Sequence, residues 1–563
     1  MSYFELKNKL AETLGFKVEK FHLDFPVHAD FGDLYSNSAL SIAKSEGRDP
    51  MLVAEDLKNK IMSISLPEID RVEVVAPGFV NITLSKDFFV GSIREIISND
   101  YYGRSGILKD KKIIIEYTDP NPFKSFHIGH LMTNTIGESL SRLYESQGAN
   151  VVRACYQGDV GLHVAMAIYG IINTGVEDEF FGSSVIRQVE IMGKAYAFGA
   201  KMNKENDNAK KDIANINVQV YERSNEKISE IYDEGRQASL QYFEKIYETL
   251  GTKFDLYFFE SETAIFGKKV VEEFLDKGVF IKSEGAVIYE GEKHGLHSRV
   301  FINSLGLPTY EAKELGLAKM KYNSYPYDVS IVVTANEVKE YFNVVKRAML
   351  DVYPELAQKT IHIPHGVMML PSGKMSSRTG DVVTFDEIFE SIKSSVKEKM
   401  SDREFTDKEK TIEDIAIGAI KYSILKSSPG KDIIFDINKS VSLDGDSGPY
   451  LQYASVRAKS VLNKAGVDES GVHFKSDGIV SVPQVARVLF RFEKELEEAT
   501  LSNSPQKIVT YLLGVSSLFN NFYAQNKIIG GEQEDFHLAV ALSVSRVIKN
   551  GLMVLGINTP DRM

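Results

Sequence analysis

The sequence predicts a multidomain α/β protein in which a doubly wound parallel sheet lies between a small α+β module and a helical C-terminal region. Three observations support this fold class. The chain has 563 residues, which is too many for a single hydrophobic core. A strand–helix–strand pattern with strands of the fully buried type begins at residue 112. Beyond residue 396, apolar residues recur at helical spacing, so we expect domains at 1–98, 99–395 and 396–563.

The composition is that of an ordinary globular protein, with 43% hydrophobic and 26% charged residues. The first residues lack the cationic start and apolar run of a signal peptide, and no stretch reaches the ~20 apolar residues of a membrane span. The single cysteine, Cys155, excludes a disulfide framework and a cysteine-ligated zinc site. We therefore expect a cytoplasmic protein that binds neither zinc nor a membrane.

The net charge of −12 argues mildly against nucleic-acid binding, because phosphates are bound by local clusters of lysine and arginine. An acidic protein with one basic face would still permit such binding. The net charge therefore does not decide whether the protein binds nucleic acid.

The first module is expected to contain helices and one strand pair. Helical stretches are predicted at 4–14, 39–43 and 53–62, and β-rich stretches at 72–75 and 79–83. Pro77 and Gly78 mark the turn between the two strands.

The central domain opens with an apolar strand at 112–118, a helix from Ile128 that ends near Gly148, and a second strand at 151–156. This βαβ start is typical of a Rossmann-like sheet, in which ligands bind at the carboxyl ends of the strands. The G-x-G-x-x-G signature is absent, so a dinucleotide cofactor is not expected. Residues 175–262 are rich in charged residues and are predicted to form a helical insertion.

After the insertion, strand patterns resume at 254–259, 286–289, 329–333 and 361–363. Thr384 and Glu387 form a capping box that predicts a helix start. In the C-terminal region, Ser504 and Pro505 predict another helix start, with a serine cap and a proline in the first helical position.

Two histidines, His127 and His130, flank Gly129 where the first helix of the central domain begins. A helix N-terminus favours anions, so the pair could contact phosphate and stabilise a pentacovalent phosphorus. Structural histidines or half of a metal site are the alternatives. Their spacing is not that of a zinc-binding helix, and no third ligand is evident.

A second polar segment, Gly373–Gly380, carries Lys374 and Arg378 together with serine hydroxyls. Its cations could neutralise a pyrophosphate and its hydroxyls could donate hydrogen bonds. Taken alone, the segment is better interpreted as an ordinary solvated loop.

Together these two segments resemble the signature elements of class I aminoacyl-tRNA synthetases. Longer segments extend the resemblance across essentially the whole chain and narrow it to the arginyl-tRNA synthetases: Phe31–Asn37, Glu116–His130, Gly158–Gly161, Gly306–Glu314, Lys374–Asp381, Gly448–Ala454 and Thr559–Met563.

The resemblance implies a pocket for L-arginine, whose planar, permanently charged guanidinium requires a carboxylate and a flat partner. Tyr310 and Glu314 would line this pocket. Glu116 and Asn121 would hold the α-amino and carboxylate end, beside His127.

The resemblance also implies that ATP is bound with Mg²⁺ and activated to arginyl-adenylate. ATP would be contacted by His127, Gly129, His130, Lys374, Met375 and Ser376. His127, His130, Lys374 and Lys124 would act in catalysis. Lys124 enters this set because Ser377 stands where many class I enzymes have a second lysine, for which Lys124 would compensate.

Two further departures concern the arginine pocket. Glu314 stands where many members of the family have aspartate. A glutamine expected near Ala335–Val338 is not evident. This part of the pocket stays open at the level of sequence.

The partner implied is tRNA(Arg), which accepts arginine on its terminal ribose and is required for arginine activation. The helical region would bind the anticodon, and the N-terminal module would contact the tRNA through Phe31 and Asn37. Candidate anticodon contacts are Tyr450, Gln452, Tyr453 and Arg457, because unpaired bases stack on aromatic rings. The two tyrosines could equally pack inside a helical bundle. We expect a monomer.

Two other functions remain open. One is a class I synthetase for cysteine, glutamate or lysine, although one cysteine disfavours the zinc-dependent cysteine enzyme and an acidic pocket disfavours glutamate. The other is a non-catalytic tRNA-binding paralogue, which would have no need of His127, His130, Lys124 and Lys374 together.

Overall fold

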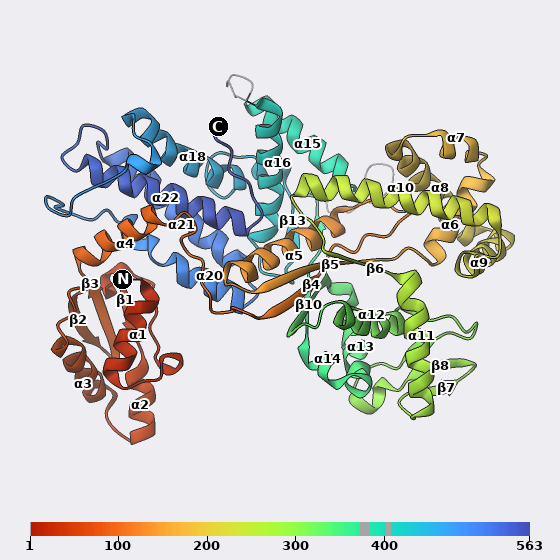
Figure 1. Cartoon of the computed structure of the whole chain (residues 1–563), viewed down its shortest axis with the longest axis horizontal. Coiled ribbons are helices and arrows are strands. Elements are labelled where there is room, and N and C mark those ends of the chain that lie inside the picture. Colours follow the sequence, from red (N-terminus) through yellow and green to blue (C-terminus); the bar gives the residue numbers. More distant parts are fainter. Residues whose placement is uncertain (1, 372–382, 401–406) are drawn as a thin grey trace. The chain divides into compact units, whose positions relative to one another are not determined.

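A computed structural model describes residues 2–371, 383–400 and 407–563. The chain divides into two compact units, shown in Figure 1 and treated separately below. The first unit comprises Met1–Ser105, Asp402–Tyr422 and Val441–Met563. The second comprises Gly106–Ser401 and Ser423–Ser440. No helix in the described ranges is long and apolar enough to cross a membrane.

The N-terminal part of the first unit is the predicted α+β module. Its three-stranded antiparallel sheet has the order β1-β3-β2 and packs against helices. The elements are α1 (Tyr3–Leu14), β1 (Leu34–Ser36), α2 (Ser38–Glu46), α3 (Pro50–Ser63), β2 (Ile69–Val75), β3 (Phe79–Leu84) and α4 (Lys86–Ser98).

The rest of the first unit is helical. The long helix α22 is buried along most of its length, between α18, α21 and α4. Its elements are α16 (Lys408–Leu425, which continues into the second unit), α18 (Gly448–Ala465), α19 (Ala486–Leu489), α20 (Phe492–Leu501), α21 (Gln506–Gln525) and α22 (Glu534–Val554).

A buried carboxylate joins the N-terminal module to these helices. Asp33 accepts a hydrogen bond from the backbone N–H of Leu84 at 2.8 Å. The guanidinium of Arg487, from α19, contacts both oxygens of Asp33 at 2.8 and 3.0 Å. Phe490, which follows α19, packs into the hydrophobic core of the module. The Phe31–Asn37 segment therefore contains at least one residue with a structural task.

The second unit is built on a parallel sheet of five strands in the order β11-β10-β4-β5-β6, which confirms the predicted fold class. The central strand, β4, is apolar because both of its faces are covered by helices. The strands are β4 (Lys112–Glu116), β5 (Asn150–Gln157), β6 (Leu256–Phe259), β10 (Val329–Ala335) and β11 (Thr360–His365).

The helices of this unit follow the strands in the alternation expected of a doubly wound sheet. They are α5 (Ile128–Ser146), α6 (Leu162–Asn173), α11 (Glu260–Asp276), α12 (Tyr310–Ser324), α13 (Lys339–Val352), α14 (Pro354–Lys359), α15 (Phe385–Lys399) and α17 (Ile437–Ser440). The predicted start of α15 is confirmed, with Thr384 and Glu387 forming a capping box.

The strand expected at 286–289 lies outside the parallel sheet. It forms β8 (Ala286–Tyr289) in a separate antiparallel sheet with β7 (Ile281–Ser283) and β9 (Arg299–Ile302). Glu284 and Gly285 have φ values of 47° and 81°, so a two-residue turn joins β7 to β8. Such a turn can connect only antiparallel strands, which explains why the main sheet skips this segment.

Two details of the C-terminal region differ from expectation. Ile433–Ile434 forms a short strand, β13, that pairs in parallel with β12 (Met368–Met369) of the same unit. Ser504 does not cap α21: Pro505 stands at the N-cap position with no side-chain cap, and the Ser504 hydroxyl donates to the carbonyl of Ser502.

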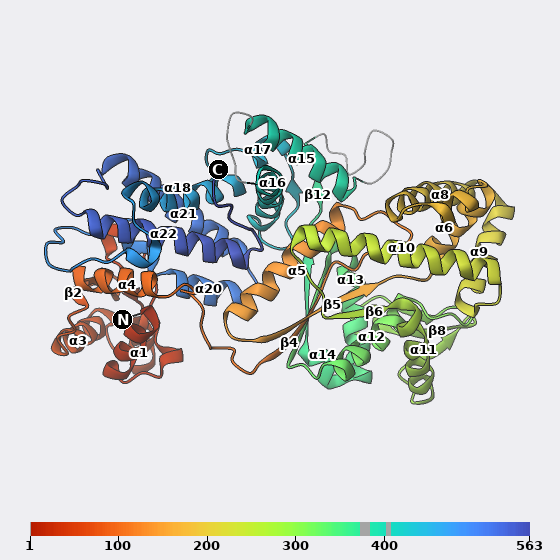
Figure 2. The same cartoon turned by 45° about the horizontal axis from the view of Figure 1, so that its top comes forward.

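The insertion is helical, as predicted. It consists of α7 (Glu177–Gly182), α8 (Val185–Glu205), α9 (Asp207–Glu222) and α10 (Glu226–Leu250). Figure 2 shows these helices gathered beside α6, against which α8 and α9 pack. Two glycines allow this close approach. A methyl group at Gly170 would lie 2.1 Å from the carbonyl oxygen of Ala195, and one at Gly199 would lie 2.0 Å from that of Met166.

We therefore expect Gly199→Ala to destabilise the protein by about 1–3 kcal/mol, because the added methyl group has no space between α6 and α8. Urea unfolding followed by circular dichroism would measure the change. Gly193→Ala, in the same helix, is the matched control, since the contact nearest to its added methyl group is a side-chain atom at 3.5 Å. It should be neutral or stabilising by up to about 1 kcal/mol. Equal effects of both substitutions would contradict this account of the packing.

Candidate active site

The main cavity of the second unit opens at the carboxyl ends of the parallel strands, where ligands bind in doubly wound sheets. Its volume is about 750 Å³. Residues that follow β4, β5, β10 and β11 line it, together with the first turns of α5 and α12. They include Glu116, Asp119, Asn121, His127, Gly129, His130, Glu260, Tyr310, Glu314, Glu337 and His365.

The two histidines form a mutual cap at the start of α5. The Nδ1 of His127 accepts a hydrogen bond from the N–H of Gly129 at 3.1 Å, and the Nδ1 of His130 accepts from the N–H of His127 at 3.3 Å. The two rings stack with their centroids 3.7 Å apart. A methyl group at Gly129 would lie 2.9 Å from the His127 ring, so this position requires glycine.

Both imidazoles are neutral in this arrangement. Burial, together with the nearby charge of Lys124, lowers the pKa of His127 to about 4. Burial depresses the pKa of His130 well below its usual value. Since each Nδ1 already accepts a hydrogen bond, each Nε2 carries the remaining proton and is left as a donor. Across the described ranges, no set of three histidine, cysteine or carboxylate side chains is arranged to hold a metal ion.

The predicted ATP-binding residues Lys374, Met375 and Ser376 lie outside the described residues, as does the sequence around them. The described residues that follow this segment contact the histidine region through their backbone. Phe385 donates to the carbonyl of Phe126 at 2.9 Å, and Ile128 donates to the carbonyl of Val383 at 3.2 Å.

Lys124 does not line the cavity but lies close to the histidine pair. Its ammonium group lies 5.1 Å from the centre of the Tyr196 ring, on α8 of the insertion. Burial lowers the pKa of Lys124. Its charge in turn lowers the pKa values of His127 and His130, so these three side chains form one electrostatic group.

Three carboxylates of the cavity have cationic partners. Glu116, at the end of β4, is buried and forms an ion pair with Lys321 of α12 at 2.5 Å. Glu260 pairs with Lys313, also from α12, at 2.6 Å. The third pair, Glu311 with Arg299, is longer, at 3.6 Å.

Two further carboxyls that are not exposed, Asp119 and Glu314, form no ion pair with any residue that the structure describes. The exposed Glu337 of the cavity wall likewise has none there. One oxygen of Asp119 accepts from the N–H of Tyr156 at 2.7 Å. Burial and the neighbouring Glu116 raise the pKa of Asp119 well above its usual value. The same two causes raise the pKa of Glu314 to about 8. The cavity therefore has two carboxyl groups suited to a cationic ligand.

The backbone that presents Asp119 is strained. Thr118 and Asp119 have φ values of 80° and 48°, in the left-handed region that side chains other than glycine seldom adopt. Each such residue costs roughly 1–3 kcal/mol, and this strain is typical of functional sites. Nothing in the hydrophobic pattern of β4 indicates it.

The structure brings together the predicted arginine-binding residues Glu116, Asn121, His127, Tyr310 and Glu314 around this cavity. Tyr310, the first residue of α12, is 60% exposed. Where the family resemblance led us to expect a glutamine, Glu337 and Val338 line the wall.

Asp119, Lys313 and Lys321 are not among the residues predicted from the sequence. Asp119 lies inside the segment used for the resemblance, and Lys321 is seven residues after Glu314 on the same helix. These positions in the sequence could have indicated Asp119 and Lys321 as candidates, but they do not show which side chains the two residues contact.

Three of the four anticodon candidates, on α18, form a connected group with α21. Arg457 donates to Asn520 at 2.8 Å and to the hydroxyl of Tyr453 at 3.0 Å, and Asn520 donates to the hydroxyl of Tyr450 at 2.9 Å. The guanidinium also lies over the rings of Tyr453 and Tyr523, at 4.7 and 5.4 Å.

The predicted anticodon contact of the fourth candidate, Gln452, does not agree with its position in the structure. Its side chain is fully buried and donates to the carbonyls of Asp414 at 2.9 Å and Asn558 at 2.7 Å. It therefore holds helices and chain segments together within the first unit and does not present itself to a ligand. In the N-terminal module, Phe31 is 46% exposed and Asn37 precedes α2 without capping it through its side chain.

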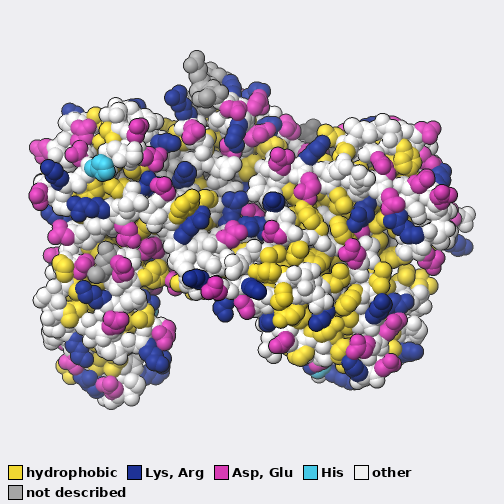
Figure 3. All heavy atoms as spheres, in the orientation of Figure 1, with side chains coloured by type: hydrophobic (Ala, Val, Ile, Leu, Met, Phe, Trp, Pro, Cys, Tyr) yellow, Lys and Arg dark blue, Asp and Glu magenta, His cyan; other side chains and the backbone are white. Residues whose placement is uncertain are grey.

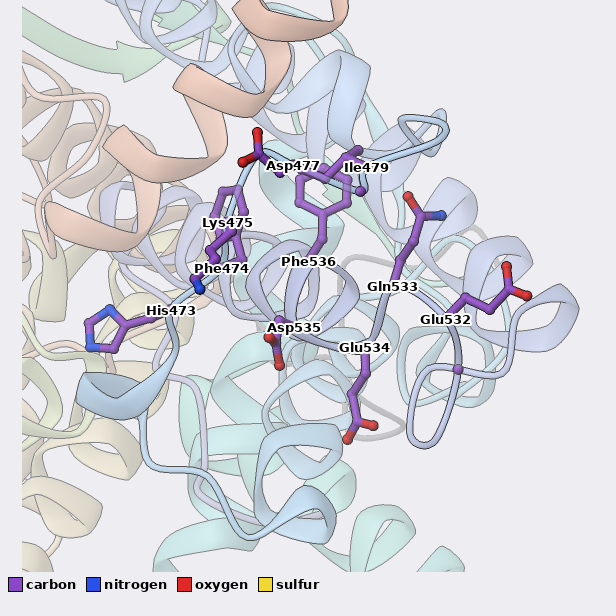
Figure 4. A pocket seen from close by; sticks show the side chains of 12 residues that line it. His473, Phe474, Lys475, Asp477, Ile479, Glu532, Gln533, Glu534, Asp535 and Phe536 are labelled. Atoms are coloured by element: carbon purple, nitrogen blue, oxygen red, sulfur yellow. The ribbon is translucent and has the colours of Figure 1, made fainter.

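A second cavity, of about 600 Å³, lies in the first unit between the segments His473–Ile479 and Gly531–Phe536. Its acidic side chains, Asp477, Glu532, Glu534 and Asp535, point in different directions (Figure 4). They do not converge as catalytic or ligand-binding groups would.

The charged surface also lacks one dominant acidic area on the face drawn in Figure 3. There, lysine and arginine side chains are interspersed with aspartate and glutamate side chains. The acidic net charge of the chain is therefore not gathered on this face.

Comparison with known proteins identifies the domains. A family model described as "tRNA synthetases class I (R), catalytic domain" matches residues 92–437. The "Arginyl tRNA synthetase N terminal domain" matches residues 5–84, and the "DALR anticodon binding domain" matches residues 451–563.

Full-length relatives and solved structures agree with these matches. Proteins named "Arginine--tRNA ligase" from Clostridium beijerinckii and Clostridium botulinum are 27% and 28% identical, over 99% of this chain and 100% of their own length. The arginyl-tRNA synthetase of Thermus thermophilus has the same fold, with a TM-score of 0.80 and 21% identity over 100% of both chains. That of Plasmodium falciparum matches with a TM-score of 0.79 and 18% identity, over 99% of this chain and 98% of its own. Because the catalytic-domain model spans more than half of the sequence, the chain belongs to the class I arginyl-tRNA synthetases.

Proposed function

We propose that this chain ligates L-arginine to tRNA(Arg) in two ATP-dependent steps, through arginyl-adenylate and with release of pyrophosphate and AMP. One observation carries the proposal. A single cavity combines two neutral imidazole donors at a helix N-terminus with two carboxyls, Asp119 and Glu314, that are not exposed and lack cationic partners among the described residues. The first feature suits a triphosphate, and the second suits a substrate with two positive groups.

The charge pattern favours arginine because this amino acid has a guanidinium at one end and an α-ammonium at the other. Glu314 would pair with the guanidinium, against the ring of Tyr310. Asp119 and Asn121 would hold the α-ammonium. Glu116, which the resemblance assigned to this end, is already neutralised by Lys321, so it lies behind the ligand rather than serving as its main partner.

In the first step, the arginine carboxylate attacks the α-phosphorus of ATP and displaces pyrophosphate. Negative charge on the phosphoryl oxygens would be stabilised by the Nε2–H donors of His127 and His130 and by the charges of Lys124 and Lys374, with Ser376 and Met375 contacting the nucleotide. Neutral histidines are suited to this, since they donate without holding the pyrophosphate as tightly as cations would.

Mg²⁺ would accompany ATP and neutralise part of the triphosphate charge. The unpaired carboxyls of the cavity are assigned to arginine in this proposal. The ion would therefore be coordinated mainly by phosphate oxygens and water.

In the second step, the terminal ribose hydroxyl of tRNA attacks the adenylate carbonyl and releases AMP. Tyr450, Tyr453 and Arg457 would bind the anticodon, supported by the grouping of two partly exposed aromatic rings with a guanidinium. Phe31 and Asn37 would contact the body of the tRNA. We propose that the protein acts as a cytoplasmic monomer, with domain boundaries near residues 98 and 396.

The central test is arginine-dependent ATP–pyrophosphate exchange, measured with and without total tRNA. We expect exchange only in the presence of tRNA. Lys124→Ala should lower the rate about 10²- to 10³-fold, because a charge next to the reacting phosphate is lost. Lys124→Arg should retain more of the rate than Lys124→Ala. The control is Lys194→Ala, an exposed lysine on α8, which should exchange like the wild type.

Other outcomes would exclude parts of this proposal. Exchange with another amino acid but not arginine would mean that the pocket is misassigned. Binding of tRNA without exchange for any amino acid would identify a non-catalytic paralogue. Full activity of Lys124→Ala would remove Lys124 from the mechanism while leaving the reaction in place.

A second prediction concerns proton release. With a pKa of about 8, the Glu314 carboxyl is about nine-tenths protonated at pH 7. A guanidinium favours the ionised form, so arginine binding should release about one proton from this residue at pH 7 and progressively fewer above pH 8. Isothermal titration calorimetry in buffers of different ionisation enthalpy would measure the release.

Glu314→Gln is the matched variant, since it keeps the shape of the side chain but cannot titrate. It should weaken arginine binding at least tenfold and lower the proton release at pH 7 by about one. An unchanged release in this variant would show that Glu314 does not face the guanidinium.

A third prediction concerns tRNA. Arg457→Gln should raise the KM for tRNA about tenfold, because one stacking and hydrogen-bonding group is lost from the surface of α18. The exchange rate at saturating tRNA should be unchanged. Lys459→Gln, another cation on the same helix, should have little effect. A lower unfolding temperature of Arg457→Gln with an unchanged KM would mean that the Arg457 network is only structural.

A further inference from the structure

One buried histidine in the cavity wall has no task in the mechanism above. His365 is the last residue of β11 and is 2% exposed. Its Nε2 lies 2.9 Å from the hydroxyl oxygen of Thr133, and its Nδ1 lies 2.6 Å from the carbonyl oxygen of Gly366. The same Thr133 hydroxyl lies 2.9 Å from the carbonyl oxygen of Gly129.

These contacts join two elements that are far apart in sequence. Thr133 and Gly129 belong to the first turns of α5, the helix that carries the histidine pair. His365 and Gly366 begin the segment that leads to β12. The Nδ1–H of His365 donates to the carbonyl of Gly366, so its Nε2 accepts from the Thr133 hydroxyl, which connects the end of β11 to the start of α5.

The two elements form facing walls of one part of the cavity. Gly129 and Thr133 line it from α5, and Gly366, Val367 and Met368 line it from the other side. Among these residues there is no charged side chain, in contrast to the carboxyl-rich part formed by β4 and α12. A narrow uncharged space bounded by glycine and backbone suits a flat heteroaromatic base with polar edges.

The outer wall of this space is fixed independently. A methyl group at Gly366 would lie 2.3 Å from the carbonyl oxygen of Lys431, so the two segments are in close contact. The N–H of Val367 donates to Asp432 at 2.9 Å, and the N–H of Ile433 donates to the carbonyl of Val367 at 2.8 Å. The remaining variable is the distance between this wall and α5.

We propose that His365 is a positioning residue that sets this distance through Thr133 and so controls the affinity of the site for ATP. This inference rests on the proposed function, because it takes ATP as the substrate. His365 does not touch the reacting atoms. It holds the Gly129 turn at a fixed separation from the Gly366–Met368 backbone.

The test is a comparison of KM values in the exchange assay. His365→Ala and Thr133→Val should each raise the KM for ATP about tenfold, while the KM for arginine changes less than twofold. The KM for ATP of the double variant should be no higher than that of the single variant with the larger KM, because both substitutions break the same connection. His365→Gln, whose amide can still reach the Thr133 hydroxyl, should recover most of the ATP affinity.

Thr360→Val is the control for a general loss of a buried hydroxyl. Thr360 begins the same strand, is buried, and donates to the carbonyl of Leu356 at 2.7 Å, away from the cavity. This variant should keep the wild-type KM for ATP. An equal rise of both KM values in His365→Ala, or an unchanged KM for ATP, would overturn the positioning role.

The two proposals can fail separately. Absence of exchange in the wild-type protein would overturn the proposed reaction. The role of His365 would then still be decided by calorimetric ATP binding, where equal affinities of wild type and His365→Ala would overturn it and a tenfold loss would support it.

Discussion

The structure of the second unit depends on the neutralisation of buried carboxylates at the carboxyl edge of the sheet. Helix α12 supplies both buried lysines that do this, Lys321 for Glu116 and Lys313 for Glu260. A buried carboxylate that loses its cation costs about 3–5 kcal/mol, so these pairs fix α12 against β4 and α11. The same helix presents Glu314 to the cavity without a cationic partner in the described part of the chain. One helix therefore carries both the buried ion pairs and a carboxyl of the cavity wall, and its position cannot change without affecting both.

The cavity separates two kinds of chemistry within a short distance. One part is rich in carboxyls and suits a substrate with two positive groups. The other part begins at α5, where the stacked imidazoles of His127 and His130 use one nitrogen each to cap the helix and leave the second as a donor. Because burial keeps both rings neutral, they repel neither the cationic groups of a substrate nor Lys124. The two parts can thus bind oppositely charged substrates side by side.

Much of the fold could be predicted from the sequence, because the periodicity of apolar residues reports burial. The five buried-type strands and the capping box at Thr384 are examples. The failures have a common cause, which is that the contacts concerned join distant segments. The apolar alternation at 286–289 is real, but a two-residue turn directs that strand into another sheet. Gln452 has the chemistry of a base-reading residue, yet the carbonyls of Asp414 and Asn558 hold it in the interior. The pairing of Glu116 with Lys321 spans two elements, and no local pattern indicates it.

The grouping of residues on α12 has an evolutionary consequence. A single substitution at Glu314 alters the charge of the cavity wall, but the lysines one residue before it and seven residues after it remain paired with acids on α11 and β4. Replacing the whole of α12 would leave Glu116 and Glu260 without their cationic partners. Changes of substrate preference along this lineage are therefore expected to be epistatic, with paired replacements at α12 and its acidic partners inherited together.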